Sequence, residues 1–350
     1  MPERVIREGT HPFRPRPRLS PLLRRPAVLL AAAILLALCI LASLFVGSSR
    51  IPADQVAHYL LHPDASNVSY NINVLRVERT IIGVLVGAAL AVSGAVMQAV
   101  TRNPLAEPGL LGVNAGASLG IVLGTAALGV LPVPGQLLLA AVGALVATAL
   151  VQVIGMIRGS TSSPVRLVLI GVAFSAFAGA VIRGVVLTMP NLFRTFIDWE
   201  VGSLTRADIP LLPMTLLVAL GTGAALLLAG ALDNIALGDD VAAALGTRVG
   251  LVRGLSLVVV TLLCATATTV AGPIGFVGLM APLTASWLMG LHRGWIVALC
   301  ALGGPVVVLA ADVLGRVLAR PGEMQVGLLT AFVGSPVLLL MVLRMKDRAS

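Results

Sequence analysis

Charged residues are scarce in this sequence. Only 11% of its 350 residues are Asp, Glu, Lys or Arg, whereas hydrophobic residues make up 58% and the mean hydropathy is +1.01. A soluble protein of ordinary composition carries about 25% charged residues. This shortage of charge excludes a set of soluble modules and predicts an integral membrane protein with a single transmembrane domain.

The sequence also has few of the residues from which active sites are built. Its only lysine is Lys346, so it cannot supply the lysine that follows the glycines of a P-loop. Three cysteines (Cys39, Cys264 and Cys300) lie inside apolar runs without metal-ligand spacing, and four histidines are scattered through polar segments. We therefore expect no enzyme activity, no metal and no cofactor, and the energy for any transport must come from a partner or an ion gradient.

The net charge of +9 does not indicate nucleic-acid binding, because the arginines lie between apolar runs and not in one patch. Seven of them fall in residues 1–26, together with six prolines and two glutamates, which predicts a disordered basic tail. Residues 27–46 then contain no charge and are long enough to cross a membrane as a helix. We expect residues 27–346 to form the transmembrane domain.

The apolar runs predict about ten transmembrane helices in an all-α protein. Sixteen of the 24 arginine and lysine residues then lie on the side of the N-terminal tail and eight on the other, which predicts that both termini are cytoplasmic. The membrane is accordingly expected to be the plasma (inner) membrane. The predicted crossings are residues 27–46, 75–100, 109–128, 136–157, 167–187, 209–232, 250–270, 276–290, 295–314 and 326–343.

Glycines recur at every fourth position in one stretch of the chain. Gly112, Gly116, Gly120 and Gly124 have the spacing that places residues on one stripe of a helix, where a neighbouring backbone can approach closely. Before them, Thr101-Arg102-Asn103-Pro104 interrupts the apolar run and predicts a tight loop between two packed helices. Glycine spacing alone would fit any polytopic membrane protein.

The segment 232–253 is too polar to span a membrane and too rich in alanine for a loose loop. Gly238 can turn the chain, and Asp239 and Asp240 follow where carboxylates favour the start of a helix. Gly246 can end that helix, which predicts a compact element from Asp239 to Leu245. From the residues alone, a solvated surface helix remains the alternative.

Asp312 is the one acidic residue deep inside an apolar run, and Arg316 follows four residues later. Two residues at this spacing share a helix face, so we expect the two charges to neutralise each other and not to relay protons. A gradient-driven secondary transporter would need an intramembrane ionisable group, and this pair is the candidate that the sequence offers.

The string GAALAVSGAVMQAVTRNPLAEPGLLGVNAGASLG (residues 87–120) closely resembles the signature of the FecCD/BtuC-like permeases of iron-siderophore, haem and vitamin B12 ABC importers. Further blocks match at residues 75–80, 198–204, 271–279, 311–316 and 327–336, so the resemblance leaves out only the tail, the first helix and the loop after it.

The resemblance implies a type II ABC importer permease of about ten helices. Such a permease works as a homodimer or as a heterodimer with a paralogue, in membrane lipid, with ABC ATPase subunits and an extracytoplasmic substrate-binding protein. The resemblance assigns ATPase coupling to Gly238, Asp239, Asp240, Ala243, Leu245 and Gly246; docking of the binding protein to Arg76, Arg79 and Arg316; and helix packing to Gln98, Asn103, Pro104, Gly112, Gly116, Gly120, Gly272, Pro273 and Gly275.

The chain departs from the family pattern at three places. Leu283 and Ser286 stand where members of the family typically have histidine and arginine, and Met324-Gln325 replaces Leu-Pro. These changes could alter contacts with the ATPase or with a second permease, as in a heterodimer whose other half keeps the missing residues. An iron-siderophore complex is the expected substrate, with haem or a cobalamin as the alternative, and the sequence does not decide between them.

Overall fold

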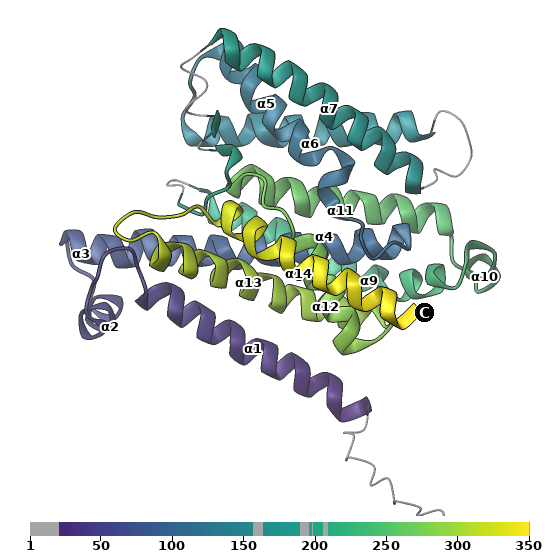
Figure 1. Ribbon diagram of the computed structural model, residues 1–350, viewed down its shortest axis with the longest axis horizontal. Coiled ribbons are helices and arrows are strands. Elements are labelled where there is room, and N and C mark those ends of the chain that lie inside the picture. Colours follow the sequence, from purple (N-terminus) through teal and green to yellow (C-terminus); the bar gives the residue numbers. More distant parts are fainter. Residues whose placement is uncertain (1–20, 157–163, 190–195, 198, 206–208, 350) are drawn as a thin grey trace, which may run out of the picture.

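The computed structural model describes residues 21–156, 164–189, 196–197, 199–205 and 209–349. Residues 1–20 of the predicted tail lie outside these ranges, and residues 21–26 are helical. Within them, the chain is folded into helices joined by short loops, and no strand occurs. Figure 1 shows the long helices lying side by side in one bundle, with α2 and α3 at one end and α10 at the other. We call these the α2 end and the α10 end.

Ten apolar helices of the described ranges correspond to the ten predicted crossings. Seven are long and apolar enough to span a membrane by themselves, and three are shorter apolar helices. The seven are α1 (Pro21–Phe45), α4 (Val77–Thr101), α6 (Val133–Met156), α7 (Pro164–Thr188), α9 (Leu211–Ala236), α11 (Val249–Ala271) and α13 (Arg293–Leu318), and the three are α5 (Val113–Leu128), α12 (Val277–Met289) and α14 (Val326–Ala349).

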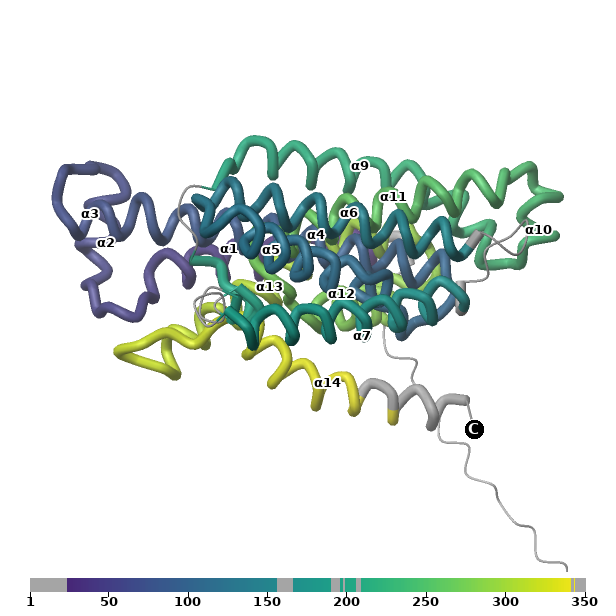
Figure 2. Tube along the Cα trace, turned by 90° about the horizontal axis from the view of Figure 1, so that it is seen from above, coloured from purple at the N-terminus to yellow at the C-terminus, as the bar shows by residue number. Residues whose placement is uncertain are grey.

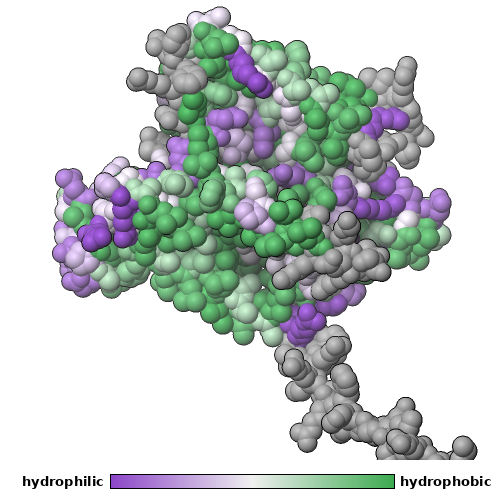
Figure 3. Space-filling model, in the orientation of Figure 1, coloured by the Kyte–Doolittle hydropathy of each residue, from purple (hydrophilic) through white to green (hydrophobic). Residues whose placement is uncertain are grey.

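The remaining elements cap the two ends of the bundle. At the α2 end, α2 (Ala53–Leu61) and α3 (Asn67–Tyr70) precede the π-helical turn η1 (Asn71–Arg76), which runs directly into α4. The short helix α10 (Asp239–Ala244) lies at the opposite end, and the 3₁₀ turn η2 (Pro108–Leu111) precedes α5. Hydrophilic residues gather at both ends of the face in Figure 3, with a hydrophobic surface between them that suits lipid.

Helix α4 forms the centre of the bundle and packs against α9, α11, α12 and α13. Its residues from Val86 to Val100 are all buried. This burial requires small residues: a Cβ atom at Gly94 would overlap the carbonyl oxygen of Gly278 in α12, and one at Gly87 would overlap the backbone at Pro305 in α13. The small side chains of α4 therefore allow its neighbours to approach to backbone contact.

The glycine stripe of α5 faces α6, and the two helices pack along most of their length in a layer with α7 (Figure 2). A Cβ at Gly120 would lie 3.0 Å from the Cα of Gly143, and one at Gly116 would lie 2.5 Å from the carbonyl oxygen of Gly143. The predicted position of Gly112 on this helical stripe is wrong. Gly112 precedes α5 with a φ of +79°, where it ends η2 in a left-handed conformation that glycine adopts readily.

We predict that Gly116→Leu destabilises the protein, because the new side chain would have to displace Ala147 and the backbone of α6. Overpacking of this kind typically costs about 1–3 kcal/mol. The thermal midpoint of the detergent-solubilised protein measures this loss. Gly223→Leu in α9 is the matched control, because no atom lies within 4 Å of a Cβ built at Gly223. Equal midpoints for the two variants would contradict the close α5–α6 packing.

Candidate functional site

A buried ion network joins α4 and α13 near the α2 end. The carboxylate of Asp312 is 2.7 Å from Nη2 of Arg79 and 2.8 Å from Nη2 of Arg316. The Asp312 side chain is 0% exposed, and those of the two arginines are nearly as buried. Pairing between Asp312 and Arg316 confirms the prediction from their spacing, and Arg79 is an additional partner from a different helix.

The network also ties α1 and the loop before α14 to these helices. Arg316 donates hydrogen bonds to the carbonyl oxygens of Ser43 (2.9 Å) and Val46 (2.8 Å). Arg79 reaches a second carboxylate, that of Glu323, at 2.5 Å, and Glu323 also accepts a hydrogen bond of 2.7 Å from Ser48. Four segments far apart in the sequence are therefore held by one set of charges.

Arg76 joins this end of the bundle differently. Its guanidinium donates hydrogen bonds to the carbonyl oxygens of Leu44 (2.9 Å) and Ser49 (3.2 Å), and it forms no ion pair with a carboxylate of the described residues. Its exposed fraction is 4%. Arg76 is thus a buried cation whose charge is not matched by a directly bound carboxylate.

The three arginines assigned to docking are buried at the α2 end and do not stand on an open surface. Arg76, Arg79 and Arg316 are 4%, 8% and 1% exposed, because intrachain partners fold over them. They nevertheless line a common pocket of about 360 Å³ at the α2 end, together with Glu78 and Glu323. Their role in docking stays a prediction, and the pocket is where it would be exercised.

The α10 end carries the short helix predicted within residues 232–253. It extends from Asp239 to Ala244, with Leu245 as its C-cap, so the expected helix is confirmed. Gly238 and Gly246 have φ values of +116° and +82°, which explains why glycine flanks the helix on both sides. Asp240 lies with Asp239 in the first turn, where the helix dipole favours negative charge.

Ion pairs fasten α10 to two long helices. Asp239 pairs with Arg102 at the end of α4 and with Arg253 of α11, the latter at 3.0 Å. Arg102 also donates a hydrogen bond of 2.8 Å to the carbonyl oxygen of Ile235 in α9. A force applied to α10 is therefore carried directly to the bundle.

The outward face of this region is apolar. Leu237, Val241 and Leu245 follow one another at four-residue intervals and are 65%, 47% and 58% exposed, whereas Ala242 behind them is fully buried. Ala243 is exposed beside them. Large apolar side chains exposed together are characteristic of surfaces that contact another protein or a membrane.

Of the residues assigned to helix packing, Gln98 joins α4 to α12, whereas Asn103 and Pro104 lie exposed in the turn after α4. Gln98 donates a hydrogen bond of 3.2 Å to the carbonyl oxygen of Leu279, and the side chain of Asn103 accepts one of 3.0 Å from the backbone of Leu105, beside Pro104. The backbone N–H of Phe276, next to Gly275, donates to Glu107 at 3.2 Å.

The loop that follows α11 is equally confined. Gly272 has a φ of +75°, and a Cβ there would overlap the carbonyl oxygen of Trp199. The carbonyl oxygen of Pro273 would lie 3.0 Å from a Cβ placed on Gly202. Glu107 and Trp199 are residues in these contacts that we did not single out, although both belong to blocks with a recognisable signature. Within the described ranges, no three His, Cys, Asp or Glu side chains are grouped closely enough to hold a metal ion.

The fold and its two polar ends are those of a transport permease, and comparison with known proteins agrees. The chain belongs to the FecCD transport family, which it matches over residues 35–344. It is 43% identical over 303 residues to the ferric enterobactin transport system permease protein FepD of Escherichia coli K12, which covers 86% of this chain and 90% of FepD. It is 37% identical over 303 residues to the Fe(3+)-citrate import system permease protein YfmD of Bacillus subtilis, covering 85% and 88% of the two chains.

A solved structure shows the same architecture. The inward-facing structure of a metal-chelate type ABC transporter matches with a TM-score of 0.80 at 25% identity, over 91% of this chain and 99% of the other. The type II permease fold expected from the sequence is thereby confirmed.

We predict that Asp312→Asn strongly destabilises the protein, because it leaves two buried arginines without their shared carboxylate. Removing one partner of a buried ion pair typically costs about 3–5 kcal/mol. Glu323→Gln is the matched comparison and should cost less, since the Glu323 side chain is 35% exposed. The thermal midpoints in detergent measure both effects. A larger loss from Glu323→Gln would contradict the central position of Asp312.

The contribution of Glu323 should also depend on pH. Burial alone would raise the pKa of its carboxyl group, but the hydrogen bond from Ser48 and the bonds and charge of Arg79 outweigh burial and lower the pKa. A carboxyl whose pKa is lowered by folding stabilises the protein fully above its ordinary pKa and loses that effect as the pH falls through the lowered value. The midpoint difference between the protein and Glu323→Gln should therefore shrink in acid.

Proposed function

We propose that this chain is the transmembrane permease subunit of a binding-protein-dependent ABC importer for iron-siderophore complexes. The proposal rests on one observation above all: a rigid helix with an exposed apolar face, α10, lies at one end of a FecCD-family bundle. The similarity to permeases for ferric enterobactin and Fe(3+)-citrate supports iron chelates as the substrate class. Hydrolysis of ATP belongs to a partner subunit.

In this proposal the α10 end is cytoplasmic and binds the ATPase. Leu237, Val241 and Leu245 provide the apolar contact, and the ion pairs of Asp239 hold α10 against α4 and α11. A short helix fixed in this way transmits a displacement of the ATPase to the helices instead of absorbing it in a flexible loop. Alternation between outward- and inward-open states would follow from that displacement.

The α2 end then faces the extracytoplasmic binding protein. Acidic side chains of that protein would enter the pocket lined by Arg76, Arg79 and Arg316. Arg76 is the most available of the three charges, because Arg79 and Arg316 already pair with Asp312. Because the three arginines are buried, salt should screen such pairs less than it screens pairs at an exposed rim.

The proposal further places both termini in the cytoplasm, the bundle in the plasma (inner) membrane, and a second permease beside it. That second permease would be another copy of this chain or a paralogue. The departures bear on this choice: Leu283 is 2% exposed, so the position of the family's histidine belongs here to the core. A histidine contact to a partner subunit is therefore absent from this chain's side of the assembly.

Reconstitution tests the function. Proteoliposomes that contain the permease and its ATPase, with binding protein outside, should accumulate an iron-siderophore complex only when ATP is present inside. An ATPase whose P-loop lysine is changed to alanine is the control and should abolish accumulation. Accumulation of haem or a cobalamin instead would retain the importer and correct the substrate. Accumulation driven by an ion gradient without ATPase would overturn the proposal.

We predict that Ala243→Pro uncouples the transporter. Proline inside α10 would remove a helical hydrogen bond and clash with the preceding turn, at a cost of about 3 kcal/mol. The ratio of substrate accumulated to ATP hydrolysed in proteoliposomes measures coupling, and it should fall steeply. Ala243→Ser is the matched control, because the side chain is exposed and serine keeps the backbone N–H. An unchanged ratio in Ala243→Pro would show that α10 does not transmit the displacement of the ATPase to the helices.

A further inference from the structure

A recess of about 630 Å³ opens at the α10 end beside the coupling helix. The ends of α4 and α9 and the turn between α12 and α13 form its walls. The residues that line it come from three regions. The end of α4 provides Gln98 and Arg102, the end of α9 provides Asp233 and Leu237, and the α12–α13 region provides Ser286, Leu291 and Arg293. None of the packing contacts described above requires so large a space.

Arg293 gives the recess a positive charge that Asp233 balances only at a distance, because the two side chains form no ion pair. Its Nε is buried and has no hydrogen-bond partner within the described residues. The neighbouring carboxylate of Asp233 accepts the backbone N–H of Arg293 with its Oδ1 at 2.9 Å, and its Oδ2 lies 3.9 Å from Nδ1 of His292. The Arg293 side chain as a whole is only half-buried, so its guanidinium can still pair with a carboxylate from outside, which would be a strong charge-assisted contact.

Ser286 explains why the recess has room. Its hydroxyl donates a hydrogen bond of 2.8 Å to the carbonyl oxygen of Leu283 in its own helix, so it does not extend across the space. An arginine at this position, as the family pattern typically has, would project a long side chain from the same wall. With serine at this position, the recess stays open at the polar end of the bundle.

The recess is continuous with the apolar face of α10. Leu237 belongs to both, since it lines the recess and begins the exposed row that continues through Val241 and Leu245. Leu291 on the opposite wall is 85% exposed. A protein that covers α10 therefore also reaches the recess, and its apolar surface would bury both leucines.

We infer that the recess is a second contact site for the ATPase subunit. The ATPase would insert an acidic side chain into the recess to pair with Arg293, while a cleft of the ATPase binds α10. This inference rests on the proposed function and adds to it a specific charge contact and a specificity element at Ser286. In a permease with arginine at this position, the arginine side chain would fill the recess and make it more positive, so the ATPase of that permease would contact a different surface. This permease should therefore discriminate among ATPase subunits at the recess.

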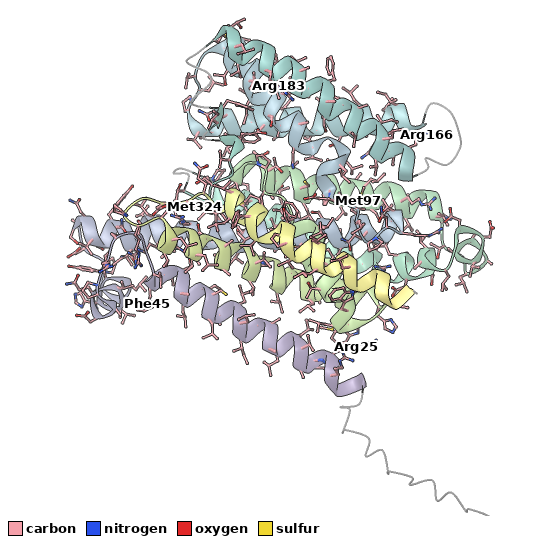
Figure 4. The ribbon with its side chains drawn as sticks, in the orientation of Figure 1. Arg25, Phe45, Met97, Arg166, Arg183 and Met324 are labelled. Atoms are coloured by element: carbon pink, nitrogen blue, oxygen red, sulfur yellow. The ribbon has the colours of Figure 1, made fainter. Side chains whose placement is uncertain are left out.

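The affinity of the permease in nanodiscs for its ATPase tests the charge contact. Arg293→Gln should weaken binding by about thirtyfold or more, as truncating one partner of a buried charge pair does. Arg166→Gln is the matched control: Arg166 is exposed on α7, does not line the recess, and appears apart from α10 in Figure 4. The thermal midpoint of the permease alone distinguishes a contact with the ATPase from a structural role of Arg293. If Arg293 has no structural role, Arg293→Gln should leave this midpoint unchanged or raise it.

Ser286→Arg and a cross-link complete the design. Ser286→Arg should prevent binding by filling the recess, whereas Ser286→Ala should bind as the protein does. In a Cys39→Ser background, a cysteine in place of Leu291 should cross-link to the ATPase. If Arg293→Gln and Ser286→Arg both bind the ATPase as tightly as the unsubstituted permease does, and no cross-link forms, the second contact site is wrong. The proposed function would remain intact. Failure of the unsubstituted permease to bind any ATPase would instead overturn the proposed function.

Discussion

One buried carboxylate holds the α2 end of this bundle together. Asp312 is fully enclosed between α4 and α13, where an unpaired charge would be prohibitively costly, and two arginines converge on it. Because Arg316 also bonds to backbone oxygens of α1, and Arg79 to Glu323, the position of four segments follows from this single group. The network explains how a protein with so few charges concentrates several of them in one buried place.

The small residues of α4 and α5 perform the complementary task in the rest of the bundle. In lipid there is no hydrophobic force between helices, so close packing must come from surfaces that fit at short range. Gly87 and Gly94 admit α13 and α12 to the backbone of α4, and Gly116 and Gly120 admit α6 to α5. The polar network fixes which helices meet at one end, and the glycine contacts fix how closely they run.

Much of this structure could be predicted from the sequence, because the relevant signals are local. Charge-free runs predicted the crossings, two glycines around Asp239 predicted α10, and a four-residue spacing predicted that Asp312 pairs with Arg316. Contacts between distant segments could not be predicted. Arg79 meets Asp312 across 233 positions of sequence, and no spacing rule reaches that far.

The same limit applies to the exposure of side chains. Arginines near predicted helix ends are expected to extend into water, and only the fold shows that α1 and the segment around Glu323 cover them. Gly112 was misplaced for a related reason: its spacing fits the stripe, but the chain turns through η2 before α5 begins. The recess beside α10 was likewise invisible, since it depends on how three separate segments end.

Helix α13 connects the two polar ends of the bundle. Its 26 residues form a rod about 39 Å long, with Arg293 at one tip and Arg316 near the other. Close to the middle, Gly304 and Pro305 contact Gly87 of α4 with no side chain between the backbones. One continuous helix therefore carries both a lining residue of the recess beside α10 and a member of the Asp312 network, so the two polar ends of the bundle share a single structural element.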